Sequence, residues 1–160
     1  MVLRVDVVCA ALEAVYGGLG RRRTVALSPQ GRLLDQDLVE QLAREDELAI
    51  LSARFEGFDE RIVEHVATDV VSIGRYVLSG GELPAMVLVD AIGRRLPGAI
   101  RAESGAVESF SAELEGGLEF PHYTRPPEFR GWKVPDVLLS GDHARIAAWR
   151  RERSQERTAS

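Results

Sequence analysis

The fold is decided by residues 71–86, which read Val71-Ser72-Ile73-Gly74-Arg75-Tyr76-Val77-Leu78-Ser79-Gly80-Gly81-Glu82-Leu83-Pro84-Ala85-Met86. The stretch starts as a β-branched run, passes through three glycines and a serine, and becomes an amphipathic pattern with Pro84 in the first helical turn. This order predicts a strand, an open loop and a helix. Because glycines let the backbone come close to a ligand, the loop is a candidate ligand site. An ordinary strand-to-helix turn is the alternative.

The residues before this stretch repeat the same order. Short apolar runs predict strands, and periodic apolar positions between them predict helices. Asp35 and Asp59 are candidate N-caps for two of the helices. Since the strands are apolar without alternation, they favour an α/β fold with a parallel sheet that is covered on both faces. The expected strands are 24–27, 48–51 and 69–73, a turn is expected at 28–31, and the expected helices are 5–16, 36–42, 60–63 and 83–96.

The residues after the last of these helices differ in composition. Residues 101–117 are rich in Gly, Ser, Ala and Glu and predict a mobile linker. Residues 118–135 are rich in proline and aromatic residues and predict an extended, docked segment. Ser140-Gly141-Asp142 predicts the cap of a last helix, from His143 to about Arg157, which is strongly basic.

Composition limits the function classes. The chain has 160 residues, 45% of them hydrophobic, and a formal net charge of −5, so contact with nucleic acid must come from local arginine clusters. Its single cysteine, Cys9, cannot form an internal disulfide, which suits a reducing compartment. The N-terminus does not resemble a signal peptide, and no segment approaches membrane-spanning length. We therefore expect a soluble cytoplasmic protein without a membrane partner.

Three loops follow the ends of the three predicted strands, at residues 28–31, 53–58 and 74–82. Ligands of open α/β sheets bind at this edge. None of the loops carries a dinucleotide fingerprint or a phosphate-binding loop, so a dinucleotide enzyme is not indicated. Neither His65 nor His143 has carboxylate or cysteine partners at metal-ligand spacing, so no protein metal site is predicted.

The sequences of these loops resemble those of a known family. Ser72-Ile73-Gly74 with residues 76–82, Ser28-Pro29-Gln30-Gly31, Arg54 to Arg61, Pro121 to Pro126 and Val137 to Ala144 match, in order, the blocks of the bacterial tRNA (guanine-N1)-methyltransferase family, TrmD. That family belongs to the SPOUT class. The resemblance implies a parallel sheet flanked by helices, a deep trefoil knot and S-adenosylmethionine held inside the knot, largely by backbone contacts. It also implies a homodimer, and magnesium as a possible further requirement.

The resemblance implies a set of cofactor-binding positions. They are Leu27, Ser28, Pro29, Glu56, Gly57, Ser72, Ile73, Gly74, Tyr76, Leu78, Gly80, Gly81 and Pro84. Glu56 could balance the positive charge of a sulfonium or amino group, or it could form an ion pair with Arg54 or Arg61. Asp59 could contact the substrate, cap its helix, or do both.

The implied reaction is methylation of guanine N1 at position 37 of tRNA, next to the anticodon. N1 carries a proton, so a general base is needed, and Glu108 stands where the family has its catalytic aspartate. Arg94 is the candidate that stabilises the negative charge on guanine O6. A solvated linker carboxylate is the alternative for Glu108, and a charge favoured by the helix dipole is the alternative for Arg94.

The last helix resembles the first helix of the family's tRNA-binding domain, so Arg145 and Arg150 are expected to contact the tRNA anticodon stem-loop. A merely solvated helix, with Glu152 and Glu156 as ion-pair partners, is the alternative. His122, Tyr123 and Arg125 are expected to shape the site or pack the linker.

We expect three parts: a knotted donor-binding domain (1–100), an inter-domain linker (101–138) and the start of a tRNA-binding domain (139–160). Compared with the family, the chain looks shortened at both ends. The alternative function is therefore a dimeric module that binds S-adenosylmethionine or tRNA with weak or no turnover.

Overall fold

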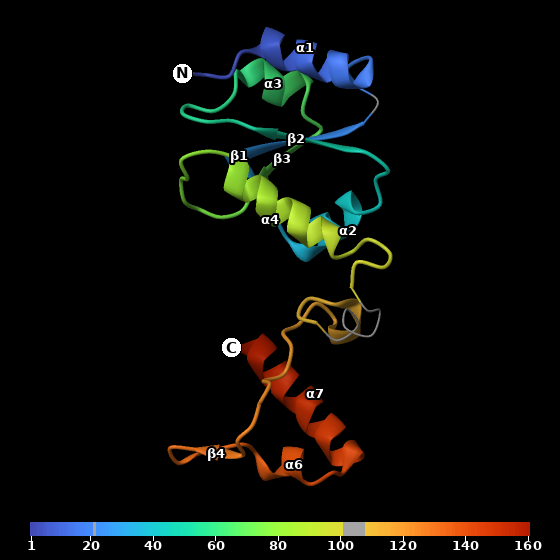
Figure 1. Cartoon of the computed structure of the whole chain (residues 1–160), viewed down its shortest axis with the longest axis vertical. Coiled ribbons are helices and arrows are strands. Elements are labelled where there is room, and N and C mark those ends of the chain that lie inside the picture. The colour runs from blue at the N-terminus through green and yellow to red at the C-terminus, as the bar shows by residue number, and fades with distance from the viewer. Residues whose placement is uncertain (21, 101–107) are drawn as a thin grey trace. The chain divides into compact units, whose positions relative to one another are not determined.

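A computed structural model of the chain describes residues 1–20, 22–100 and 108–160. The chain divides into two units, Met1–Ala99 and Ile100–Ser160 (Figure 1). The predicted division into donor domain, linker and tRNA-binding part stays a prediction.

The first unit is built on a parallel three-stranded sheet in the order β2-β1-β3, which confirms the expected parallel sheet. The strands are β1 (Arg23–Leu33), β2 (Leu48–Ser52) and β3 (Asp69–Ser72). Four helices flank it: α1 (Val5–Tyr16), α2 (Gln36–Leu42), α3 (Glu60–His65) and α4 (Glu82–Gly93). Figure 1 shows α1 and α3 on one face of the sheet and α2 and α4 on the other. Both faces are thus covered, as the unbroken apolar strands predicted.

Local capping fixes where two of these helices begin. The Asp35 carboxylate accepts a hydrogen bond from the Leu38 N–H at 2.8 Å, and the Asp59 carboxylate accepts one from the Arg61 N–H at 3.1 Å. Both bonds satisfy N–H groups that have no partner inside the helix. The two predicted caps are confirmed.

The predicted end of the fourth helix was wrong. The helix was expected to run through Leu96, but α4 ends at Gly93. Beyond that point the Arg95 N–H donates to the Ile92 carbonyl at 2.9 Å and the Leu96 N–H to the Gly93 carbonyl at 3.2 Å. These three-residue bonds tighten the chain into turns, and glycine is a poor helix residue.

The core of this unit lies between the sheet and the α2/α4 layer. Buried side chains from β1, β3 and both helices meet there: Val25, Leu27, Leu38, Leu42, Val71 and Leu88. The central strand β1 and helix α2 contribute two of these residues each. This packing holds β1 and β3 against α2 and α4.

Strand β1 departs from the prediction. It was expected to end at Leu27 before a turn at residues 28–31, yet it continues to Leu33. Leu27 and Arg32 both pair with Val71 of β3. Residues 28–31 therefore leave the sheet, in an excursion from the strand, and β1 pairs with β3 again from Arg32. The return needs a glycine at position 31, because a Cβ there would lie 2.5 Å from the Val70 carbonyl carbon. Because Gly31 and Val70 are far apart in the sequence, no local sequence pattern indicates this contact.

The second unit contains a 3-10 turn (Ala112–Leu114), a hairpin of β4 (Glu128–Phe129) and β5 (Trp132–Lys133), a short α6 (Asp136–Leu139) and the long α7 (His143–Ala159). The Asp142 carboxylate accepts from the Arg145 N–H at 3.1 Å, so the predicted cap of the last helix is confirmed. The hairpin and α6 were not predicted. Of the expected linker, residues 101–107 lie outside the described residues, and the Phe110 N–H donates to the Gly117 carbonyl at 2.7 Å.

Candidate functional site

A cavity of about 450 Å³ lies where the three strands of the first unit lead into their loops. Every position predicted to bind the cofactor lines this cavity. They come from three separate segments: Leu27, Ser28 and Pro29; Glu56 and Gly57; and Ser72, Ile73, Gly74, Tyr76, Leu78, Gly80, Gly81 and Pro84. The structure thus brings together residues that are far apart in the sequence.

The loop after β3 reaches across to the end of β2. The Gly81 N–H donates to the Ala53 carbonyl at 2.8 Å, and the Ser52 hydroxyl donates to the Gly81 carbonyl at 3.0 Å. A Cβ on Gly81 would stand 2.9 Å from the Ser52 Cα, which is closer than real contacts allow. Glycine at this position therefore permits the two loops to form one continuous wall.

The beginning of the same loop is held by Ser72, which is buried. Its hydroxyl donates a hydrogen bond to the Gly74 carbonyl at 2.9 Å, and the same hydroxyl oxygen accepts one from the Gly74 N–H at 3.2 Å. A Cβ on Gly74 would collide with the ring of Tyr76. The absence of a side chain at Gly74 therefore gives the Tyr76 ring its place against the backbone.

Sequence reasoning missed one ion pair at this site. Arg54 pairs with Glu82 and so joins the loop after β2 to the first turn of α4, and the arginine lowers the pKa of the Glu82 carboxyl. The partners are far apart in the sequence, so no local pattern could reveal the pair. Arg61 in turn pairs with Asp59 at 2.7 Å. Both arginines considered as partners of Glu56 are therefore engaged by other carboxylates.

Asp59 acts as a helix cap in this structure. Hydrogen bonds from the Arg61 side chain, and then from its backbone N–H, lower the pKa of Asp59 to about 2. A carboxylate with so low a pKa is a weak proton acceptor near neutral pH. The capping role is confirmed, and contact with substrate stays a prediction.

The two predicted catalytic residues lie in different units. Arg94 is the C-cap of α4, and its N–H donates to the Asp90 carbonyl at 3.1 Å. Glu108 is half-buried, and its carbonyl accepts from the Ser111 N–H at 3.1 Å. Their chemical roles stay predictions.

The basic helix α7 shows two kinds of arginine. The Arg150 guanidinium lies 4.7 Å from the centre of the Phe120 ring, and Arg145 is exposed in the first turn. Arg153, by contrast, pairs with Glu152 at 3.2 Å and with Glu156 at 2.6 Å. The alternative interpretation, a solvated helix with Glu152 and Glu156 as ion-pair partners, therefore holds for Arg153.

A second cavity, of about 1050 Å³, lies within the second unit. His122, Tyr123, Arg125 and Arg150 are among its lining residues. The His122 ring also lies 2.8 Å from the Glu119 carboxylate. These residues thus shape a cavity of their own unit.

Among the residues that the structure describes, no group of three or more His, Cys, Asp or Glu side chains is arranged to hold a metal ion. Within the same residues, no helix has the length and apolar character needed to span a membrane.

Comparison with known proteins identifies the family of the chain. A family model described as tRNA (Guanine-1)-methyltransferase TrmD matches residues 1–160. A tRNA (guanine-N(1)-)-methyltransferase of Brevibacillus brevis is 52% identical over 159 residues, which are 99% of this chain and 64% of that protein. Proteins of the same description from Lachnospira eligens and Dehalococcoides mccartyi are 50% identical over 160 residues and 53% identical over 134 residues. The alignments cover 66% and 53% of those two proteins, so this chain spans between about half and two thirds of its curated relatives.

Proposed function

The chain belongs to the tRNA (guanine-1)-methyltransferase TrmD family, and from this premise we propose that it transfers a methyl group from S-adenosylmethionine to N1 of guanine at position 37 of tRNA. One observation carries the proposal. All the positions that the resemblance assigns to the methyl donor line a single cavity, although they come from three separate segments.

The cavity suits the donor in size and in chemistry. Its volume of about 450 Å³ lies in the range of small-ligand sites. Gly74, Gly80 and Gly81 let their loop pass close to neighbouring protein atoms where a Cβ would collide, so the loop can form a compact wall around a flat ligand. We assign the Glu56 carboxylate, which lines the cavity, to the positive charge of the donor.

When bound, the donor supplies an electrophilic methyl group. The protein must then remove the N1 proton of guanine, and we assign this step to the Glu108 carboxylate. It would accept the proton as N1 bonds to the methyl carbon and the S–CH3 bond of the donor breaks, with S-adenosylhomocysteine as the leaving group. Negative charge develops toward O6 as the proton leaves, and we assign its stabilisation to the Arg94 guanidinium. Because N1 lies on the Watson–Crick edge, the base must be unpaired.

The proposed fold includes the trefoil knot. Two contacts support it: β1 returns to β3 through Arg32 and Leu33, and the chain after β3 then crosses to the end of β2 at Gly81. Because β1 lies between β2 and β3, the segment between β3 and Gly81 must cross the end of β1, where residues 28–31 leave the sheet. A chain threaded into a knot would make these contacts.

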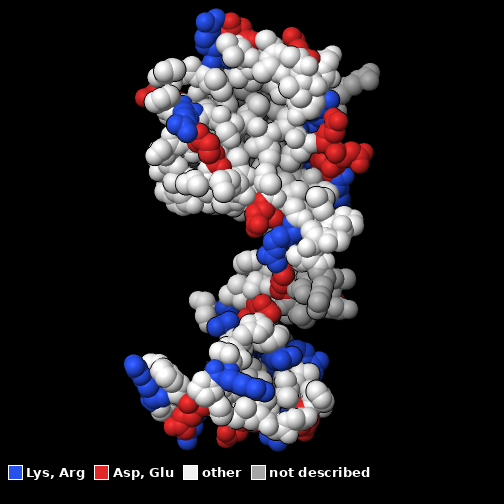
Figure 2. All heavy atoms as spheres, in the orientation of Figure 1, with Lys and Arg blue, Asp and Glu red and all other residues white. Residues whose placement is uncertain are grey.

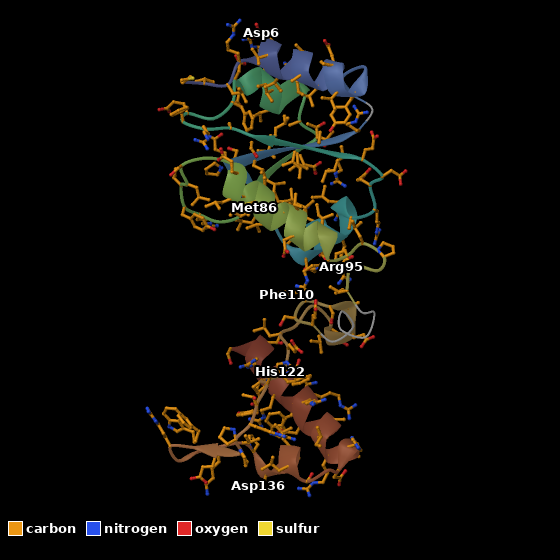
Figure 3. All side chains as sticks on the ribbon, in the orientation of Figure 1. Asp6, Met86, Arg95, Phe110, His122 and Asp136 are labelled. Carbon is orange, nitrogen blue, oxygen red and sulfur yellow. The ribbon has the colours of Figure 1, made fainter. Side chains whose placement is uncertain are left out.

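We also propose that the protein acts as a homodimer that pairs through α4. This helix is apolar on opposite sides: Ala85, Leu88 and Ile92 face the core, whereas Leu83, Met86 and Val87 are exposed. Figure 2 shows few charged side chains over this part of the first unit, and Figure 3 labels Met86 there. A helix that is hydrophobic all round is normally buried, so a second copy is the natural cover.

Two further partners follow from the resemblance. We assign Arg145 and Arg150 of α7 to phosphates of tRNA, since neither shares the Glu152 and Glu156 ion pairs of Arg153. We assign no residues to magnesium, because the described part of the chain presents no cluster that fits a metal ion.

The proposal is tested by titrating the purified chain with S-adenosylmethionine in a calorimeter and then adding unmodified tRNA that carries guanosine at position 37. Saturable donor binding followed by methyl transfer to N1 is the expected result. Donor binding without transfer would favour the alternative, a dimeric binding module. If the chain failed to bind the donor, the assignment of the cavity as the donor site would be wrong.

A further inference from the structure

The hairpin of the second unit exposes two large aromatic side chains. Trp132 is 70% exposed and Phe129 is 53% exposed, and their ring centres lie 6.0 Å apart. The two residues stand opposite each other in the ladder between β4 and β5. Exposed rings of this size, side by side, are typical of a binding surface rather than of a packed core.

The turn of this hairpin places a cation beside the rings. Arg130 and Gly131 form the two-residue loop, and both have positive φ, of 53° and 82°. A turn of this type favours Asn or Gly at its first position, so arginine is an unfavourable choice for the backbone alone. Its guanidinium lies 5.2 Å from the centre of the Phe129 ring. The charge is thereby kept next to the aromatic surface.

A second cation lies at the other end of the same short ladder. The Lys133 ammonium is 3.7 Å from the Glu128 carboxylate, and both side chains are largely exposed. The pair is long and open to water, so it is weak. Because successive side chains of a strand point to opposite faces, Lys133 belongs to the face opposite the two rings, and Arg130 is the cation beside them.

We propose that the hairpin 128–133 binds tRNA by stacking an unpaired base on the ring of Trp132, with Arg130 beside the adjoining phosphate. The inference rests on the proposed function, which makes tRNA the substrate. Exposed aromatic rings flanked by cations are the combination that binds single-stranded nucleic acid, since every base has a π-face. A protein partner would favour a broader apolar patch without a cation at its edge.

Intrinsic fluorescence gives a direct test. The chain has two tryptophans, Trp132 and Trp149, so Trp149→Phe leaves Trp132 as the only reporter. Titration of this variant with unmodified tRNA that carries guanosine at position 37 should quench the emission in a saturable way. A second titration with S-adenosylmethionine alone should leave the Trp132 emission unchanged.

Two substitutions separate stacking from general apolar contact. Trp132→Leu keeps an apolar side chain against Phe129 but removes the flat ring, and it should raise the Kd for tRNA about tenfold. Trp132→Phe should stay within about threefold of the wild type. Neither change should alter donor affinity. Val15→Ala is the matched control, because Val15 of α1 is 71% exposed and should not affect tRNA binding.

The outcomes distinguish this inference from the proposed function. If the wild type binds tRNA and Trp132→Leu binds it equally well, the stacking contact is refuted while the substrate assignment survives. If the wild type binds the donor but no tRNA, the substrate assignment itself fails and the inference fails with it. Trp132 emission that changes with protein concentration alone would assign the hairpin to a contact between copies and would overturn the RNA contact.

Discussion

The backbone of Gly31 lies so close to that of Val70 that a Cβ at position 31 would stand 2.5 Å from the Val70 carbonyl carbon. This contact joins the returning part of β1 to β3, beside residues 28–30, which line the proposed donor cavity. The shape of one cavity wall therefore depends on a residue that has no side chain.

Gly31→Ala should destabilise the protein by about 3 kcal/mol, because the new methyl group can be accommodated only if two strands move apart. Urea unfolding measures the change. Gly18→Ala is the matched control, since a Cβ there would meet nothing within 4 Å. If the two variants had equal stability, the close approach of β1 to β3 would be wrong.

Glu108→Gln should lower the rate of methyl transfer by about a hundredfold or more and leave donor affinity unchanged, because the amide cannot accept the N1 proton. Single-turnover transfer and calorimetry measure the two effects separately. Glu113→Gln removes an exposed carboxylate from the nearby 3-10 turn and should change neither. Equal turnover in Glu108→Gln and wild type would exclude Glu108 as the base.

Met86→Lys should convert the dimer to a monomer, because it places a charge in the middle of the exposed apolar face of α4. Sedimentation equilibrium gives the mass. Met86 is 67% exposed and Val15 of α1 is 71% exposed, so Val15→Lys is a control of equal exposure and should remain dimeric. A dimer that persists in Met86→Lys would place the interface elsewhere.

Affinity for tRNA should fall as salt rises, because cations that contact phosphates release counterions on binding. Arg145→Gln should reduce the slope of log K against log salt by about 0.7 to 0.9. Arg153→Gln should leave the slope unchanged, since Arg153 already pairs with two glutamates. Affinity that is indifferent to ionic strength would remove α7 as a phosphate contact.

Asp69 should make stability depend on pH at the acid end. Its carboxylate accepts from the Arg23 guanidinium at 2.8 and 2.9 Å, and this partner, followed by the Thr68 hydroxyl, lowers the pKa of Asp69 in the folded state. A lowered folded pKa stabilises the protein above the unfolded value of about 4, and the stabilisation is lost as pH falls through the folded pKa.

Asp69→Asn should therefore cost roughly 1–2 kcal/mol at pH 7 and almost nothing at the acid end of the range. Urea unfolding at pH 7 and at successively lower pH measures the difference between variant and wild type. Asp46→Asn, at an exposed position before β2, should show a small difference throughout. A constant gap between Asp69→Asn and wild type would contradict the ionic origin of the effect.

Local patterns in the sequence predicted those parts of the fold that depend on neighbouring residues. Asp35, Asp59 and Asp142 each begin a helix where their capping chemistry placed them. The three strands were recognised because each contains a short apolar run, at residues 25–27, 48–51 and 70–71.

The missed features depend on long-range contacts or on an unusual turn. The return of β1 to β3 rests on Gly31 against Val70, which no local pattern encodes. The hairpin escaped detection because its turn is Arg130-Gly131, whereas Asn-Gly or Asp-Gly is the usual signal. For the cavity, residue patterns indicated three loops at one sheet edge, and the family resemblance supplied the individual positions. The Arg54–Glu82 pair was missed because its partners meet only in the folded chain.

The strand order β2-β1-β3 has a consequence for synthesis of the protein on the ribosome. The central strand is made first, and both of its neighbours come later in the chain. During that interval β1 has two unpaired edges, and unpaired edges invite association with other chains. The nascent chain can close its sheet only after Ser72 has emerged, so we expect that interval to be the period in which it most needs a chaperone.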